Sequence, residues 1–181
     1  MLYYKCKIVE DCVVLENLIE KYFGDKVDKG GNPYVIHCRS VGYGAQFVAS
    51  AMLLLSEEEV KICREVGYLH DILEDTDCPE DELISLGISP KSIEIIKLLT
   101  HQKNEPYDEY LDKILQNGLA SIVKYADMSH NMQFERLGDK VDEETKARLK
   151  KKYETRIKKV QTALFSHFHH RLPKDIQLKK Y

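Results

Sequence analysis

What this 181-residue sequence lacks excludes several classes of protein. It has no internal repeat, no low-complexity tract and no apolar run near the roughly 18 residues that a membrane-spanning helix needs. The N-terminal segment MLYYKCKIVED has no basic region followed by an apolar region, as a secretory signal would have. The five cysteines are odd in number and never spaced as C-x-x-C, which argues against a disulfide framework. We therefore expect a cytoplasmic protein with reduced thiols and no membrane partner.

The charge of the chain is nearly balanced overall but unevenly distributed. The formal net charge of −3 argues against a nucleic-acid polymer as partner. Residues 146–181 hold 12 Lys and Arg against 2 Asp and Glu, whereas residues 1–145 hold 15 against 28. The basic segment is either a solvated helix face, which is the commoner case, or a surface for phosphate attraction or self-association in a homo-oligomer.

Apolar residues recur at helical spacing almost throughout, so we predict an all-α fold of about seven to nine helices. A chain of this length with 43% hydrophobic residues suits a single domain, residues 1–181, with a substantial core. Capping and turn residues mark the helix ends. The expected helices cover residues 9–23, 33–55, 56–76, a short acidic stretch after 79, 91–100, 107–117, 119–136 and a basic helix from about 143 to 168, followed by a tail.

The stretch GYLHDILEDTD, residues 67–77, concentrates polar groups on one side of a predicted helix. At 100° per residue, His70 lies at 0°, Glu74 at about 40°, Asp71 at about 100° and Asp75 at about 140°. Leu69 and Leu73 fall outside this arc. A stripe of one imidazole and three carboxylates is typical of a metal or catalytic site more than of a solvated helix face.

Two further residues with ligand chemistry lie at positions where the spacing predicts burial. His37 sits in the apolar stripe of the second helix, and Asp127 lies within VKYADMSHNM. Alone, His37 could equally be a core histidine, and Asp127 would more often be a surface acid than a ligand. Buried carboxylates are costly unless they are paired or bind a cation, so together these groups indicate a divalent ion. Mixed imidazole and carboxylate ligands suit Mn²⁺, Fe²⁺ or Zn²⁺ better than Ca²⁺ or Mg²⁺.

Three segments carry a resemblance to a known family. KGGNPYVIH (29–37), LHDILEDT (69–76) and VKYADMSHNM (123–132) are similar to the hydrolase domain of the RelA/SpoT-type guanosine polyphosphate enzymes and to small stand-alone relatives. The ordered set H…HD…D resembles the signature of the HD-domain metal-dependent phosphohydrolases. The resemblance spans about residues 20–140 and implies an HD-type helical bundle around one metal site.

Carried over residue by residue, the resemblance implies a role for each matching position. It implies that one metal, usually Mn²⁺ with Fe²⁺, Zn²⁺, Co²⁺ or Mg²⁺ as alternatives, is held by His37, His70, Asp71 and Asp127. Glu74 and Asp75 would position or deprotonate the attacking water, and the spacing does not choose between them. Asn131 would reach a substrate phosphate or ribose, and Lys29 would contact phosphate or base. Lys103, which lies in the loop HQKNEP, is a weaker candidate for binding phosphate.

The sequence departs from this family at positions that bear on substrate. Phe134 replaces a small hydroxyl residue and could close part of a nucleotide pocket, and Gly30 replaces a serine. The resemblance supplies no ligand role for His101 or His130, which we interpret as capping or partly exposed histidines. We therefore predict a metal-dependent phosphohydrolase of a nucleotide or nucleotide-like small molecule, with guanosine polyphosphate as the leading specific candidate. The alternative is a non-catalytic regulatory module that binds metal or nucleotide.

Overall fold

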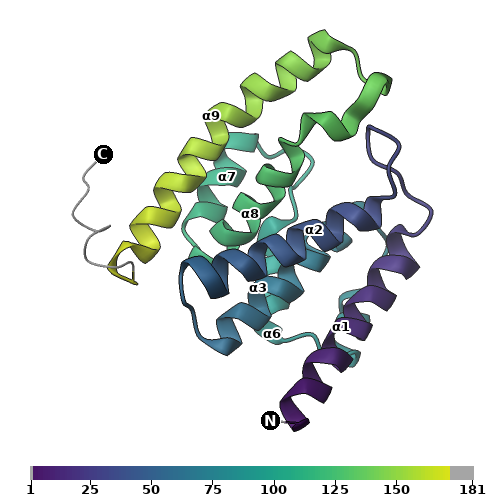
Figure 1. Cartoon of the computed structure of the whole chain (residues 1–181), viewed down its shortest axis with the longest axis vertical. Coiled ribbons are helices and arrows are strands. Elements are labelled where there is room, and N and C mark those ends of the chain that lie inside the picture. Colours follow the sequence, from purple (N-terminus) through teal and green to yellow (C-terminus); the bar gives the residue numbers. More distant parts are fainter. Residues whose placement is uncertain (1, 172–181) are drawn as a thin grey trace.

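The computed structural model describes residues 2–171, and it describes side chains from residue 12 onward. Within residues 2–171 the chain forms nine α-helices and no β-strand, as the sequence predicts (Figure 1). The helices are α1 (Leu2–Phe23), α2 (Tyr34–Phe47), α3 (Glu57–Leu69), α4 (Ile72–Asp75), α5 (Glu80–Ser85), α6 (Pro90–Leu99), α7 (Tyr107–Leu115), α8 (Gly118–Asn131) and α9 (Glu143–Phe168). The predicted tail beyond residue 171 lies outside the described residues.

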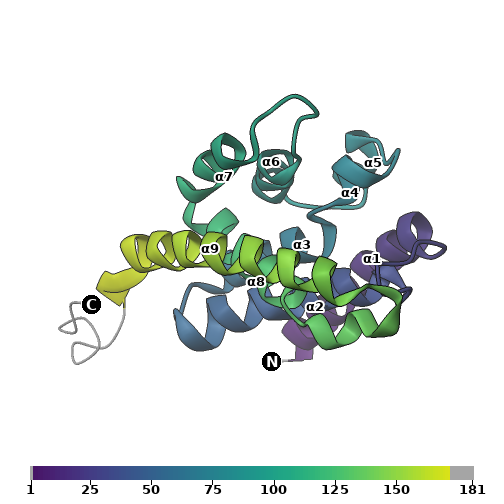
Figure 2. The ribbon, with the colours of Figure 1, turned by 90° about the horizontal axis from the view of Figure 1, so that it is seen from above.

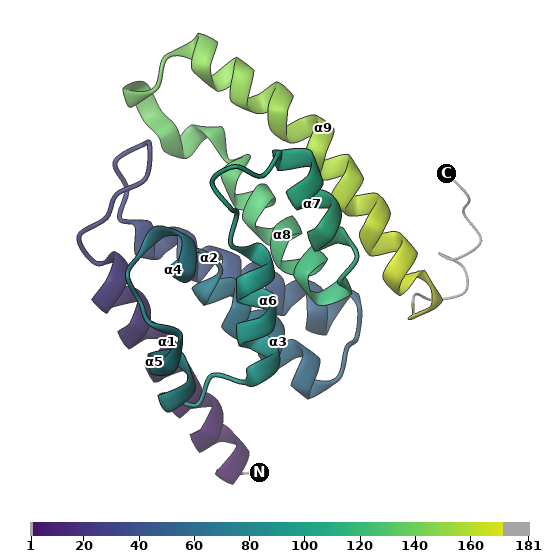
Figure 3. The ribbon, with the colours of Figure 1, turned by 180° about the vertical axis from the view of Figure 1, so that it is seen from behind.

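The helices form two layers. In one layer, α2 packs against both α3 and α8, while α1 and α9 lie at its edges (Figure 1). Figure 2 shows α4, α5, α6 and α7 above this layer. Seen from behind, α6 lies over α3 and α7 lies beside α8 (Figure 3). The predicted metal ligands lie on α2, directly after α3 and on α8, so the packing of these central helices brings them together.

Two hydrophobic clusters hold these layers together. The main cluster spans α1, α2, α3, α6 and α8 and includes the fully buried Ile19, Val41, Leu69, Ile96 and Ile122. A separate cluster of Leu111, Met128 and Val160 joins α7 and α8 to α9. Among the described residues, no helix is long and apolar enough to cross a membrane. Cys12, Cys38, Cys63 and Cys78 are free thiols, as expected.

The contact between α2 and α3 depends on two glycines. A Cβ atom added to Gly67 would lie 2.7 Å from the Cα of Gly42 and 2.9 Å from the carbonyl oxygen of Val41. Both neighbours are backbone atoms, so they can yield only if one helix moves away from the other. This close approach sets the distance between His37 on α2 and His70 at the end of α3.

We expect Gly67→Ala to lower the free energy of unfolding by about 1–3 kcal/mol, because overpacking forces the two helices apart. Urea denaturation followed by circular dichroism measures this change. Gly44→Ala is the matched control, since its added Cβ would meet only the Ala126 side chain, at 3.3 Å. That variant should change the free energy by less than about 1 kcal/mol, because the gain in helix propensity offsets the contact. Equal losses in both variants would contradict the role of this crossing.

The prediction of one continuous helix over residues 56–76 is wrong near its C-terminal end, where the predicted site residues lie. The α3 helix ends at Leu69, and α4 begins only at Ile72. Asp71 lies between them with φ −101° and ψ 1°, which is outside helical geometry. His70 Nδ1 lies 2.9 Å from the carbonyl oxygen of Gly67. The polar stripe of a single helix is therefore replaced by a break that turns Asp71 toward α2.

Other helix boundaries shift by smaller amounts. The first helix begins at Leu2 instead of residue 9. The second ends as an α-helix at Phe47 and continues as a π-helical turn over Val48–Met52. The predicted helix over 119–136 ends at Asn131 and is followed by a 3-10 segment over Phe134–Lys140. The basic helix covers Glu143–Phe168, within the predicted limits.

Candidate metal centre and adjoining pocket

The centre begins with three buried side chains from three helices. His37 on α2 is 4% exposed, His70 after α3 is 3% exposed and Asp127 on α8 is 7% exposed. One ligand atom from each lies within 4.8 Å of the other two. These residues are separated by more than 30 positions in the chain, so only the tertiary fold can bring them together.

The ligand atoms are spaced as donors around one ion would be. The Nε2 atoms of His37 and His70 are 3.2 Å apart. Asp127 Oδ1 lies 3.6 Å from His37 Nε2 and 3.9 Å from His70 Nε2. Metal bonds of about 2.1 Å place neighbouring ligand atoms about 3 Å apart and opposite ones about 4.2 Å apart. The observed distances lie within this range, so the three residues could hold a divalent ion.

Asp71 is the fourth predicted ligand, and the break after α3 places its carboxylate beside the two imidazoles. Its Oδ2 is 2.9 Å from His70 Nε2 and 3.8 Å from His37 Nε2. The same oxygen accepts a hydrogen bond from the hydroxyl of Tyr34. Tyr34 thus orients the carboxylate, as groups behind a metal ligand commonly do.

The protonation of the two imidazoles differs because of their surroundings. Burial, aided by the neighbouring His70, lowers the pKa of His37 to about 4. Burial acts in the same direction on His70, but the adjacent Asp71 carboxylate outweighs it and raises the pKa of His70 to about 9. At neutral pH the pair therefore carries one positive charge, on His70.

Asp127 is balanced by a buried lysine that the sequence did not single out. Lys124, one helical turn earlier on α8, places its Nζ 2.9 Å from Asp127 Oδ2. Burial opposes ionisation of both groups, yet each keeps the other charged: Lys124 lowers the pKa of Asp127, and Asp127 raises the pKa of Lys124. The carboxylate is therefore available as an anionic ligand through its other oxygen.

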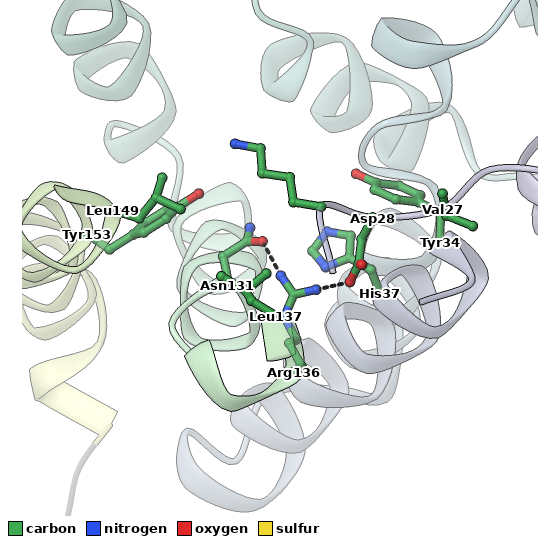
Figure 4. A pocket seen from close by; sticks show the side chains of 10 residues that line it. Val27, Asp28, Tyr34, His37, Asn131, Arg136, Leu137, Leu149 and Tyr153 are labelled. Carbon is green, nitrogen blue, oxygen red and sulfur yellow. Dashed lines mark hydrogen bonds and ion pairs between the residues drawn. The ribbon is translucent and has the colours of Figure 1, made fainter. Parts of the chain in front are cut away.

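A cavity of about 250 Å³ lies beside the centre (Figure 4). Its lining comes from the loop before α2, from the first turn of α2 including His37, from α8 with the segment after it, and from α9. The lining residues are Val27, Asp28, Lys29, Tyr34, His37, Asn131, Arg136, Leu137, Leu149 and Tyr153. Lys29 makes no hydrogen bond or ion pair with the described residues, so its ammonium group can serve an anion in the cavity.

A chain of polar contacts connects the cavity wall to the centre. Figure 4 shows the guanidinium of Arg136 between Asp28 and Asn131. Asn131 in turn donates from Nδ2 to Asp127 Oδ1. The predicted substrate-binding residue Asn131 thus lines the cavity and also orients the predicted metal ligand Asp127.

The predicted catalytic pair lies on α4, next to the predicted ligand Asp71. Glu74 and Asp75 are both exposed, and neither lines the cavity. Glu74 Oε2 accepts a hydrogen bond of 2.8 Å from the backbone N–H of His101, which fixes its position. Burial of part of each side chain raises the pKa of Glu74 and of Asp75, and the nearby Asp71 adds to both shifts.

Two residues that the sequence analysis placed near the substrate, Lys103 and Phe134, do not line the cavity. Lys103 is exposed in the loop between α6 and α7 and is absent from the cavity lining. The ring of Phe134 is also absent from that lining, so it does not close this pocket. The departure from the family at Phe134 therefore gives no steric argument against a nucleotide in the cavity.

Comparisons with known proteins address the fold. Neither a family model nor a curated protein matches the chain. A solved structure described as a metazoan ortholog of SpoT that hydrolyses ppGpp superposes with a TM-score of 0.60 at 18% identity. The superposition covers 90% of this chain and 95% of that one. This chain shares the all-α, HD-type fold of that structure.

The predicted resemblance is thus confirmed for the HD-type fold and for a buried His-His-Asp cluster that could bind a metal. Sequence reasoning missed three residues of the centre: Tyr34, Lys124 and His130. A signal for two of them was present, because Lys124, Asp127 and His130 are spaced at three-residue steps on one helix face. His130 is 8% exposed, so its interpretation as a partly exposed histidine is wrong.

Proposed function

We propose that this protein is a metal-dependent phosphohydrolase whose substrate is a nucleotide or nucleotide-like phosphate or pyrophosphate ester. The observation that carries the proposal is the convergence of two imidazole Nε2 atoms 3.2 Å apart with carboxylate oxygens of Asp71 and Asp127. Imidazole nitrogens and carboxylate oxygens lie at such distances from one another when they bind one cation. The HD-type fold, shared with a ppGpp-hydrolysing protein, supports the same reaction class.

The residues of the centre would hold Mn²⁺ best, with Fe²⁺, Zn²⁺, Co²⁺ or Mg²⁺ as alternatives. When bound, the ion lowers the pKa of a coordinated water and stabilises charge that develops on phosphorus. His37, His70, Asp71 and Asp127 orient the site and leave open positions on an ion that takes six ligands. Two neutral imidazoles with two carboxylates also balance the charge of a divalent ion.

The remaining roles fall to groups beside the centre. The unpaired Lys29 ammonium would bind a phosphate oxygen in the cavity, and Asn131 has an amide hydrogen left for phosphate or ribose. Glu74 or Asp75 would accept the proton of the attacking water, because a carboxylate of raised pKa is a better base near neutral pH. Guanosine polyphosphate, cleaved at its 3′-pyrophosphate, is the first specific substrate to test.

Purified protein with Mn²⁺ should release phosphate or pyrophosphate from at least one member of a nucleotide panel that includes guanosine polyphosphate. We expect Glu74→Gln and Asp75→Asn each to lower kcat at least tenfold with unchanged metal content, because neither side chain is a proposed ligand. The larger loss, expected to be about 10²- to 10⁴-fold, identifies the base. Asp108→Asn, on the exposed surface of α7, is a control that should retain full activity.

The contrasting function is a regulatory module that binds nucleotide without turnover. It would be favoured by tight nucleotide binding and no product release across the whole panel with each of the five metals. Calorimetric titration with the same nucleotides separates this outcome from a preparation that binds nothing.

A further inference from the structure

His130 lies behind the metal centre, one helical turn after Asp127 on α8. Its Nδ1 is 2.8 Å from the Nδ1 of His37, and the two ring centroids are 4.9 Å apart. Two ring nitrogens at this distance share one hydrogen bond, in which one nitrogen carries the proton and the other accepts it. Which nitrogen donates decides what the opposite side of the His37 ring can do.

The two possible arrangements have opposite consequences for metal binding. If His130 donates, neutral His37 must carry its proton on Nε2, the atom that faces His70 and Asp127, and that atom cannot coordinate an ion. If His37 donates from Nδ1, its Nε2 presents a lone pair to the centre. The metal-binding form of His37 therefore requires His130 as the acceptor.

Contacts of His70 show the same arrangement in the neighbouring ring. Its Nδ1 lies 2.9 Å from the Gly67 carbonyl oxygen, which can only accept, so His70 donates from Nδ1 and turns Nε2 to the centre. The Nε2 atoms of His37 and His70 lie 3.2 Å apart. His37 presents Nε2 in the same way only if its own Nδ1–H has an acceptor, and Nδ1 of His130 is within hydrogen-bond distance of it.

His130 can accept through Nδ1 when its own proton lies on Nε2. The space around the ring permits this tautomer. Two further cavities, of about 350 Å³ and 230 Å³, also border His130. They leave room for water beside the ring, so its second nitrogen can keep a proton without a protein acceptor.

We propose that His130 is a positioning residue that accepts a hydrogen bond from Nδ1–H of His37 and thereby fixes the tautomer in which His37 can coordinate a metal. Metal-bound histidines usually donate their second N–H to a carboxylate, a carbonyl or water. Here a neutral imidazole takes that place, which orients His37 without adding a negative charge. The inference rests on the proposed metal-dependent function.

The test compares two substitutions at position 130. His130→Asn places an amide oxygen near the position of Nδ1 and keeps the acceptor, whereas His130→Leu fills the space without one. In calorimetric titration of the metal-free protein with Mn²⁺, we expect His130→Leu to weaken binding by about 10- to 100-fold and His130→Asn by no more than about threefold. Unfolding midpoints of the two metal-free variants should agree within about 4 °C. Equal loss of affinity in both variants, or no loss in either, would overturn the proposal.

A second readout needs no metal and no turnover. Nitrogen NMR of the histidine side chains in the metal-free protein reports which nitrogen of His37 carries the proton. A proton on Nδ1 supports the inference, and a proton on Nε2 overturns it whether or not the protein hydrolyses nucleotides. If Mn²⁺ binds to none of the three proteins, the proposed function fails, while the NMR result still decides the hydrogen bond.

Discussion

Asp127→Ala is expected to lose Mn²⁺ binding and to lower the free energy of unfolding by about 3–5 kcal/mol. The loss of metal follows from removal of an anionic ligand. The loss of stability has a different cause: Lys124 Nζ lies 2.9 Å from Asp127 Oδ2, and the lysine is 9% exposed. Removing the carboxylate leaves a buried cation without its counter-charge. Metal content after dialysis and urea denaturation of the metal-free protein measure the two effects separately.

The matched control removes both members of the pair. The double variant Lys124→Met with Asp127→Ala replaces the ion pair by apolar groups, so most of the lost stability should return. Metal binding should stay absent, because the ligand is still missing. Full metal content in Asp127→Ala would show that this residue is not a ligand, and a double variant no more stable than the single one would contradict the role of Lys124.

The affinity for Mn²⁺ is expected to rise about tenfold per pH unit, about 100-fold from pH 6.5 to 8.5. The cause is the proton on His70, whose pKa is raised to about 9 by Asp71 despite burial. An ion must displace that proton to bind Nε2, so binding is favoured as pH approaches 9. His37, with its pKa lowered to about 4, has no such proton to lose. Calorimetric titrations in two buffers of different ionisation enthalpy should show one proton released per ion at pH 7.

The proton on His70 also makes the stability of the metal-free protein depend on pH, with the opposite sign: stability falls as pH rises. A group whose folded pKa is raised stabilises the protein below its unfolded pKa, about 6.5, and this contribution is lost as pH rises through 9.

The control for the predicted pH dependence of metal affinity is Asp71→Asn, which removes the carboxylate that raises the pKa of His70. Its metal affinity should be weaker overall and should depend less on pH above about 7. An affinity of the parent protein that stays constant from pH 6.5 to 8.5 would contradict this account of His70.

The sequence was sufficient to predict the all-α class and those residues of the centre that lie inside regular helices. His37 and Asp127 each stood at a position of apolar spacing, and the fold does bury them. The break at His70 and Asp71 could not be predicted, because the local periodicity continues through both residues. It depends on contacts with Gly67 and Tyr34, and the Tyr34 contact exists only after α2 has packed against α3.

The other residues that the sequence failed to place have the same physical cause, which is tertiary packing. Lys124 and His130 lie at three-residue steps from Asp127, but an ordinary charged helix face has the same spacing. Only the packing of α7 and α2 against α8 shows that they are buried. Lys103 was placed near the pocket from its position in a loop alone, and it lies away from the cavity lining. That residues 1–181 fold as one domain, and that Glu74 or Asp75 is the base, stay predictions.

The burial pattern along α9 has a consequence for the cavity. Leu149 and Tyr153 form the α9 side of the cavity, and both lie before the buried residues of that helix, Val160 and Phe168. Val160 packs in the smaller cluster, and Phe168 belongs to the main core. The pocket thus combines a floor of buried side chains, where the predicted ligand atoms are held, with a wall from the half of α9 that has no fully buried side chain.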